Sequence, residues 1–65
     1  MRKQISAAKL KKMPILTDVW VVNEESKREG LFFLIQCGKR KMLKSVMGKL
    51  ETIKDRDGFH YEVEE

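Results

Sequence analysis

The pattern of hydrophobic and polar positions begins with two strand-like segments joined by a polar loop. Residues 19–22 are β-branched or aromatic, which favours an extended strand over residues 15–22. Residues 23–30 are polar and end in glycine, as expected of a loop, and residues 31–37 are a second apolar run of strand length. Two such runs with a short polar connection are typical of an antiparallel β-hairpin.

A helix is predicted next, between Gly38 and Gly48. The apolar side chains of residues 39–47 fall at positions i, i+1, i+4 and i+5, on one side of a helix: Met42, Leu43, Val46 and Met47. Lys41 and Lys44 lie away from that stripe. The segment therefore predicts an amphipathic helix with an apolar inner side and a cationic outer side.

Two continuations after Gly48 fit the sequence. The helix can extend through residues 49–54, at a cost of about 1 kcal/mol for an internal glycine. Alternatively, Gly48 adopts the left-handed conformation that ends a helix, and residues 50–54 and 59–63 form a second hairpin. The hairpin is favoured because an Asp-Gly pair, a strong turn signal, precedes residues 59–63, which alternate between apolar and polar side chains.

Residues 1–13 are predicted to be a basic N-terminal arm outside a single small domain of residues 14–65. Their apolar stripe is weak, and Pro14 would end any helix because the residue before a proline avoids the helical conformation. The arm is either a short helix or a mobile tail that becomes ordered on binding. The predicted fold class is α+β: antiparallel β-hairpins packed by one short amphipathic helix, in the order ββαββ or ββαβ.

The predicted helix packs its apolar side against the sheet. The sheet residues expected in this core are Val19, Val21, Phe32, Leu34, Ile35, Phe59, Tyr61 and Val63. Burial is the usual fate of large apolar side chains on strands. For the aromatic residues of the strands the alternative is exposure beside Lys and Arg, where they would stack on nucleic-acid bases: Trp20, Phe32, Phe33, Phe59 and Tyr61.

The chain of 65 residues is short for a protein that folds alone. Below about 70–80 residues a domain usually needs a disulfide, a metal or a second copy of itself. Cys37 is the only cysteine and His60 the only histidine, so neither a disulfide nor a structural zinc site is expected. A homodimer is expected instead. The lone cysteine, without a signal-peptide pattern or a long apolar segment, predicts a cytoplasmic protein that does not enter a membrane.

Positive charge is concentrated at one end of the sequence. Residues 1–50 contain twelve Lys and Arg against four acidic residues, whereas residues 51–65 contain two against six. Two segments, 1–17 and 30–50, contain no acidic residue. We expect folding to gather the cations on one surface, away from the carboxylates, which indicates an anionic partner. The residues predicted to contact it are Arg2, Lys3, Lys9, Lys11, Lys12, Lys39, Arg40, Lys41 and Lys44.

The basic triplet of residues 39–41, directly after Gly38, carries most of this interpretation. Cations are unfavourable at a helix N-terminus, so their presence there indicates binding of phosphate or carboxylate groups. The alternative is a run of charged side chains that are only solvated. The sequence thus predicts a small nucleic-acid-binding or regulatory module that contacts phosphates non-specifically. The second hypothesis is a protein-binding adaptor or inhibitor that docks on a larger partner protein. Its small size is typical of an accessory protein of a phage or mobile element.

Catalysis is the least favoured function. A pair formed by Cys37 and His60 would be needed for a nucleophilic mechanism, but His60 falls on the polar side of its strand and Cys37 is expected to be a small buried hydrophobe. The chain contains no phosphate-binding loop, nucleophile elbow, dinucleotide fingerprint or metal-ligand spacing. We therefore expect no enzyme activity, no cofactor and no metal.

Overall fold

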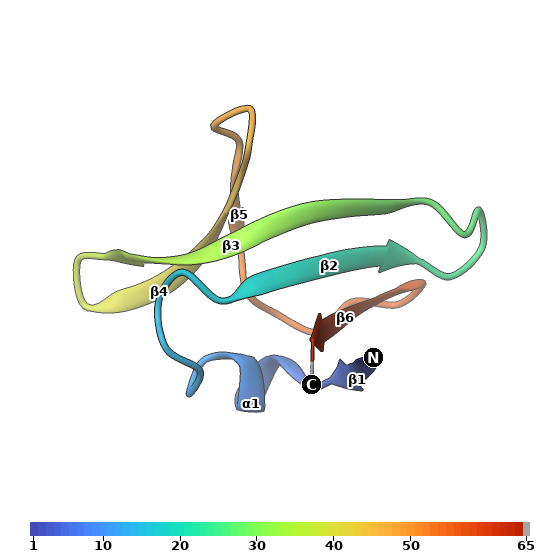
Figure 1. Ribbon diagram of the computed structural model, residues 1–65, viewed down its shortest axis with the longest axis horizontal. Coiled ribbons are helices and arrows are strands. Elements are labelled where there is room, and N and C mark those ends of the chain that lie inside the picture. Colours follow the sequence, from blue (N-terminus) through green and yellow to red (C-terminus); the bar gives the residue numbers. More distant parts are fainter. Residues whose placement is uncertain (65) are drawn as a thin grey trace.

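The computed structural model describes residues 1–64, which form one six-stranded antiparallel sheet with a single turn of helix (Figure 1). The strands are β1 (Arg2–Ile5), β2 (Asp18–Asn23), β3 (Glu29–Cys37), β4 (Arg40–Ser45), β5 (Leu50–Thr52) and β6 (Phe59–Glu64), and the helix is α1 (Ala7–Leu10). The predicted α+β fold with a packing helix is therefore wrong. The domain is built almost entirely from strands, and α1 is its only helix among the described residues.

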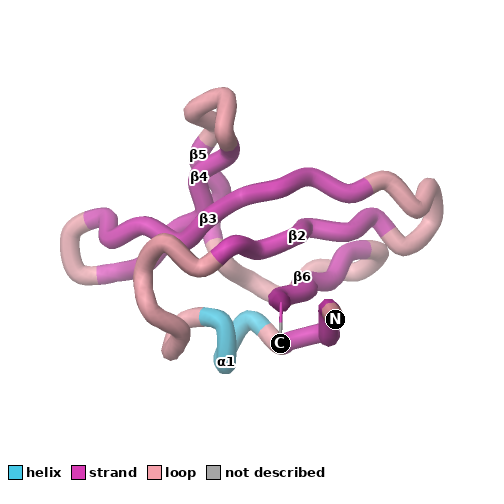
Figure 2. Tube along the Cα trace, in the orientation of Figure 1, coloured by secondary structure: helices cyan, strands magenta, loops and turns pink. Residues whose placement is uncertain are grey.

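The strands lie in the order β1-β6-β2-β3-β4-β5. Strands β2 to β5 follow one another as a meander, after which the chain returns to place β6 beside β2, and β1 then pairs with the far edge of β6. The sheet is strongly twisted, with β4 and β5 rising steeply across β3 (Figure 2). The hairpin predicted for the first two strands is confirmed by the antiparallel pairing of β2 with β3.

Strand register sorts the side chains onto an inner and an outer face. Leu34 of β3 stands opposite Leu43 of β4, and Val19 of β2 stands opposite Val63 of β6, with all four buried on the inner face. The complete buried cluster is Ile5, Ala7, Leu10, Val19, Leu34, Leu43, Ile53, Tyr61 and Val63, with Met13, Val21 and Phe32 packed against it. Ile35 and Phe59, expected in this core, do not belong to it.

The segment predicted as a helix over residues 39–47 is instead the strand β4 and the turn after it. Leu43 is fully buried, but Val46 is 75% and Met47 91% exposed, so the apolar stripe of the expected helix is split between core and solvent. Gly38, with φ of +65°, starts a two-residue turn between β3 and β4. Pairing with β3 overrides the local helical preference of this Lys- and Met-rich segment.

Residues 1–13 are part of the domain rather than an arm. β1 pairs with β6 in register from Arg2 opposite Glu64 to Ile5 opposite Tyr61. In the helix that follows, the hydroxyl of Ser6 accepts a 3.3 Å hydrogen bond from the backbone N–H of Lys9, which satisfies one free donor of the first turn. Because α1 places Ala7 and Leu10 in the core, this segment closes the inner face of the sheet.

The second predicted hairpin is present only as two separate strands. β5 pairs with β4, and β6 pairs with β1 and β2, so the two strands do not pair with each other. Gly48 has the expected left-handed backbone, with φ of +91°, but it lies in the β4–β5 turn and ends no helix. Residues 50–52 are a strand, which resolves the two alternatives for this region. No helix within residues 1–64 is long and apolar enough to cross a bilayer.

Candidate functional site

The fold brings cations from two distant parts of the sequence to one surface hollow. The hollow has a volume of about 360 Å³ and is lined by Lys11, Gln36, Lys39, Arg40, Lys41, Thr52 and Ile53. Lys11 follows α1, whereas residues 39–41 lie at the β3–β4 turn and the start of β4. Four of the seven lining residues are cationic and none is acidic. We call this hollow the basic hollow.

Hydrogen bonds fix the walls of the basic hollow. The side-chain amide of Gln36 donates to the carbonyl oxygens of Gly38 at 2.8 Å and Arg40 at 3.4 Å, and so holds the β3–β4 turn. The ammonium group of Lys41 donates to the carbonyl oxygen of Met13, which ties the segment after α1 to β4. This contact keeps the backbone near Lys11 close to the β3–β4 turn.

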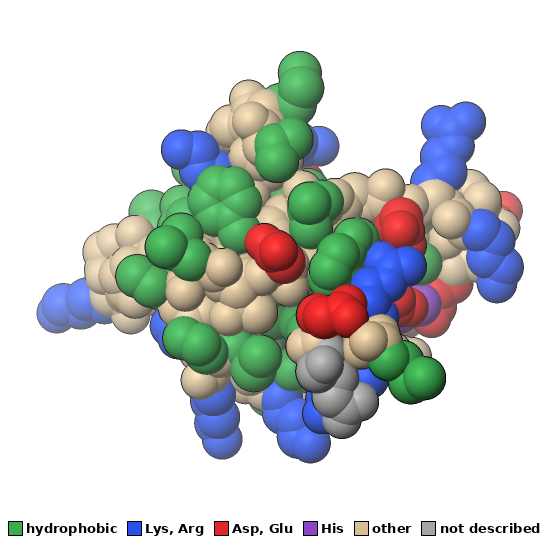
Figure 3. Space-filling view, viewed as in Figure 1, with side chains coloured by type: hydrophobic (Ala, Val, Ile, Leu, Met, Phe, Trp, Pro, Cys, Tyr) green, Lys and Arg blue, Asp and Glu red, His purple; other side chains and the backbone are tan. Residues whose placement is uncertain are grey.

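A second hollow is lined in part by residues of α1 and of the segment after it. It has a volume of about 560 Å³, and its lining includes Lys3, Lys9 and Lys12, with Glu64 as its one acidic residue. The carboxylate of Glu64 is paired with the N-terminal ammonium group at 2.6 Å. Lys and Arg side chains project below α1 and at the end of the molecule that carries the β3–β4 turn (Figure 3). The two hollows thus form one cationic region around residues 9–13.

Five cations of this region lack the carboxylate partners found elsewhere. Within residues 1–64, no ion pair involves Lys9, Lys11, Lys12, Lys39 or Arg40. By contrast, Lys49 lies 3.3 Å from Glu51, and Arg56 lies 4.0 Å from the same carboxylate group. Like charges gathered without counter-charges repel one another, at a cost of about 1 kcal/mol for a close pair in water. The arrangement therefore does not contribute to stability and leaves the charges available to a ligand.

Two of the nine residues predicted from sequence lie away from this region. Arg2 lies on the outer face of the sheet, where its guanidinium group is 2.9 Å from Glu29 and 3.5 Å from Glu62 and stacks 4.7 Å from the ring centre of Trp20. Lys44 is also on the outer face, opposite Phe33. The expected separation of charge is therefore partial. The cations around α1 and the β3–β4 turn lie away from the carboxylates, whereas other cations lie beside acidic residues.

Sequence reasoning missed two polar residues of the basic hollow, Gln36 and Thr52. Gln36 is opposite Lys41 in the β3–β4 pairing, so both side chains point to the inner face. The signal was available in the alternation of β3, where Gln36 follows Leu34 at the two-residue spacing of one strand face. It was hidden because residues 39–47 were interpreted as a helix, which offers no partner strand.

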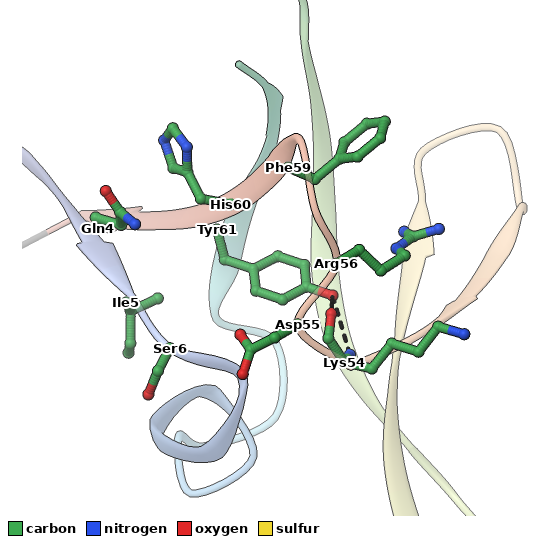
Figure 4. Close-up of a pocket in the computed structure, with 9 residues that line it drawn as sticks. All are labelled: Gln4, Ile5, Ser6, Lys54, Asp55, Arg56, Phe59, His60 and Tyr61. Atoms are coloured by element: carbon green, nitrogen blue, oxygen red, sulfur yellow. Dashed lines mark hydrogen bonds between the residues drawn. The ribbon is translucent and has the colours of Figure 1, made fainter. Parts of the chain in front are cut away.

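A third hollow, of about 360 Å³, has polar groups that the protein itself already uses (Figure 4). The hydroxyl of Tyr61 donates to the carbonyl oxygen of Lys54 at 2.8 Å and accepts from its backbone N–H at 3.1 Å. The carboxylate of Asp55 accepts a 3.2 Å hydrogen bond from the backbone N–H of Ala7. These contacts anchor the β5–β6 loop to the core and to α1, so they have a structural role.

His60 is held between two carboxylates on the outer face. Its Nδ1 lies 2.9 Å from Oε2 of Glu24, and its Nε2 lies 2.7 Å from Oε2 of Glu62. The hydrogen bond with Glu62 raises the pKa of His60 above its ordinary value of 6.5, and Glu24 adds to this effect, while partial desolvation of the ring opposes it. Protonated His60 therefore bridges β6 and the β2–β3 loop.

The free energy of unfolding is expected to decrease as the pH rises through the raised pKa of His60. The pKa is higher in the folded state than in the unfolded state, so the stabilisation is complete below about pH 6.5 and is lost above the folded-state pKa. Urea unfolding of the wild type and of His60→Gln at about pH 5.5 and about pH 8.5 measures this. A stability difference between the two proteins that is equal at both pH values would contradict the bridge.

The structure does not bring Cys37 and His60 together. Cys37 is exposed at the end of β3 next to the β3–β4 turn, so its predicted burial is wrong. His60 is opposite Val22, which is itself opposite Glu29 at the other end of β3. Eight residues of strand separate the two sites, roughly 26 Å at 3.3 Å per residue. Within residues 1–64, no three His, Cys, Asp or Glu side chains are placed to hold a metal ion.

The cationic region around residues 9–13 is therefore the candidate functional site. It rests on this chain's own geometry, since no family model, curated protein or solved structure matches the sequence or the fold.

Proposed function

We propose that the protein binds nucleic acid through the cationic region formed by the two hollows, with contacts to phosphate groups and little readout of sequence. The observation that carries the proposal is the position of Lys11 beside Lys39, Arg40 and Lys41 in a hollow without an acidic residue. Folding brings these cations together although the sequence separates them. Binding of a polyanion would offset the repulsion between these cations.

The chemistry of the region suits phosphate better than a single carboxylate. Arg40 offers a planar fork of donors, and Lys11 and Lys39 offer ammonium groups with three donors each, a set that suits the several oxygens of a phosphate group. Lys9 and Lys12, around the second hollow, continue the positive surface past α1. A nucleic-acid strand carries a phosphate at every nucleotide, so it can contact both hollows at once. Release of counterions then makes the affinity strongly salt-dependent.

A triple variant of the basic hollow is expected to bind short DNA and RNA oligonucleotides at least about tenfold more weakly than the wild type at low salt. Lys11→Gln, Lys39→Gln and Arg40→Gln are combined, and Lys41 is kept because it also holds the carbonyl group of Met13. Fluorescence anisotropy at about 50 and about 200 mM salt gives both the affinity and its salt slope. Loss of three phosphate contacts should lower the slope by about 2 for a single strand.

The matched control removes the same charge elsewhere on the surface. Lys27→Gln, Arg28→Gln and Lys54→Gln change three exposed cations outside both hollows. If this variant weakens binding as much as the first triple does, only net charge matters and the site is wrong. Absence of oligonucleotide binding by the wild type at about 50 mM salt would reject the nucleic-acid proposal. Binding of an acidic protein in its place would then favour the adaptor hypothesis.

A further inference from the structure

The outer face of the sheet carries a row of uncovered apolar side chains. Register places Leu31, Phe33 and Ile35 of β3 on this face, with Met42 of β4 opposite Ile35 and Leu50 of β5 opposite Lys44. None of these five is buried, and Leu31 and Leu50 are 40% and 50% exposed. Hydrophobic side chains gather over the middle of the molecule on the face seen in Figure 3. This row over β3, β4 and β5 is therefore left at least partly open to solvent.

The other half of the same face is covered by the chain itself. Over β1, β6 and β2, the side chain of Arg2 stacks on Trp20 and pairs with Glu29 and Glu62. An internal ion-pair cluster therefore shields the aromatic ring at that end. The uncovered apolar surface begins at β3. The small size of the domain alone does not explain it, because the chain does shield the other half of the same face.

Two opposite charges flank the centre of this face. Asp18 of β2 and Lys44 of β4 are both directly opposite Phe33, which places them in one row across three adjacent strands. At about 4.8 Å between strands, they stand roughly 10 Å apart with the ring between them. Both side chains are exposed, and neither forms an ion pair with another of the described residues.

We infer that this face binds the same face of a second copy of the chain, with the two-fold axis parallel to β3 and passing over Phe33. Rotation about that axis exchanges the two sides of the row. It therefore brings Asp18 of each copy opposite Lys44 of the other, with the two Phe33 rings stacked at the centre. An axis perpendicular to the strands would set like charges against each other. The row is thus self-complementary in one orientation, as an isologous interface requires.

A contact of standard size would use only a modest part of the surface of this chain. A standard interface covers roughly 800 Å² on each partner, about a sixth of the 4767 Å² accessible surface of this chain. Sheets that pack face to face lie about 10 Å apart, which allows Phe33 and its apolar neighbours to meet in one layer. α1 and the side chains of Gln36 and Lys41 lie on the inner side of the sheet, so dimerisation leaves this side of the cationic region accessible on both copies.

Charge reversal on one side of the row is expected to separate the dimer, and mixing the two reversals to restore it. Asp18→Lys and Lys44→Glu are prepared separately, and the molar mass of each is measured by sedimentation equilibrium from about 1 to about 500 µM. Each variant alone should show a dimer dissociation constant raised at least about tenfold over that of the wild type. An equimolar mixture should recover the wild-type value, because every contact then joins opposite charges.

Matched reversals off this face are the control. Asp57→Lys and Lys54→Glu change the same charge types in the β5–β6 loop and should leave the dissociation constant unchanged. The inference is overturned if the wild type remains a monomer over the whole range, whether or not it binds lipid vesicles or another protein. It is equally overturned if folded Asp18→Lys and Lys44→Glu proteins dimerise like the wild type, or if mixing them restores nothing. Oligonucleotide binding is a separate measurement, so its failure does not decide this one.

Discussion

Replacing Leu10 with alanine is expected to cost about 3 kcal/mol of unfolding free energy, within the range of 2–5 kcal/mol for a buried leucine. Leu10 is fully buried, although it lies in the segment whose composition resembles a basic tail. A domain of this size has only about 3–10 kcal/mol of stability in total. The substitution should therefore leave the protein largely unfolded at moderate urea concentration, as measured by circular dichroism and by the fluorescence of Trp20.

Ile15→Ala is the control for this effect, because Ile15 is an apolar residue nearby that is 51% exposed. Its replacement should change the unfolding free energy by no more than about 0.5 kcal/mol. If Leu10→Ala has an equally small effect, residues 1–13 do not contribute to the core and behave as the tail that their sequence suggests. The same comparison tests whether α1 closes the inner face of the sheet.

The second large effect is expected at Leu43. Leu43 is fully buried against Leu34, so Leu43→Ala should cost about 2–5 kcal/mol. Met47, 91% exposed, should tolerate the same change with an effect below about 0.5 kcal/mol. Urea unfolding of both variants under identical conditions gives the two values.

This pair of variants distinguishes a strand from a helix over residues 39–47. On an amphipathic helix, Leu43 and Met47 occupy the same apolar side, one turn apart, and both substitutions would be costly. On the strand β4 and its following turn, only Leu43 reaches the core. Comparable destabilisation by the two substitutions would therefore contradict the observed sheet.

The strands that were predicted correctly are those whose side chains leave little choice. Residues 19–22 are β-branched or aromatic, and they lie within β2. β3 was predicted from its apolar run, but its two faces were not, because residues 31–35 are apolar at every position. Phe32 packs on the core and Phe33 faces outward only because the register with β2 and β4 decides between them.

β4 could not be recognised because its sequence fits a helix at least as well. Lys, Met and Leu favour helices in isolation, and the i, i+1, i+4, i+5 spacing of its apolar residues is a helical signal. Gly38 and Gly48 were interpreted as helix boundaries, yet both have the positive φ of tight turns between strands. A two-residue turn starting at Gly38 was the available alternative, since glycine at the first turn position suits a hairpin.

The sequence predicts which cations could form a site, but not where on the fold they come together. The two acid-free segments do supply the cations of the basic hollow, and Lys11 meets the triplet 39–41 there. Arg2 and Lys44 could not be separated from this set by sequence, because the sign of a charge does not reveal the face of a strand. Once the register is known, both are assigned to the outer face, where Arg2 joins an ion-pair cluster and Lys44 flanks Phe33.

The position of β6 between β1 and β2 has a consequence for how the molecule forms. Both of its neighbours lie within the first 23 residues, so the sheet cannot be completed until widely separated parts of the chain have met. Folding is slow when large loops must close before stabilising contacts can form, because loop closure costs conformational entropy. During synthesis, β2, β3 and β4 would wait with an unpaired strand edge and an exposed inner face. The sheet should therefore be completed only once β6 has been synthesised.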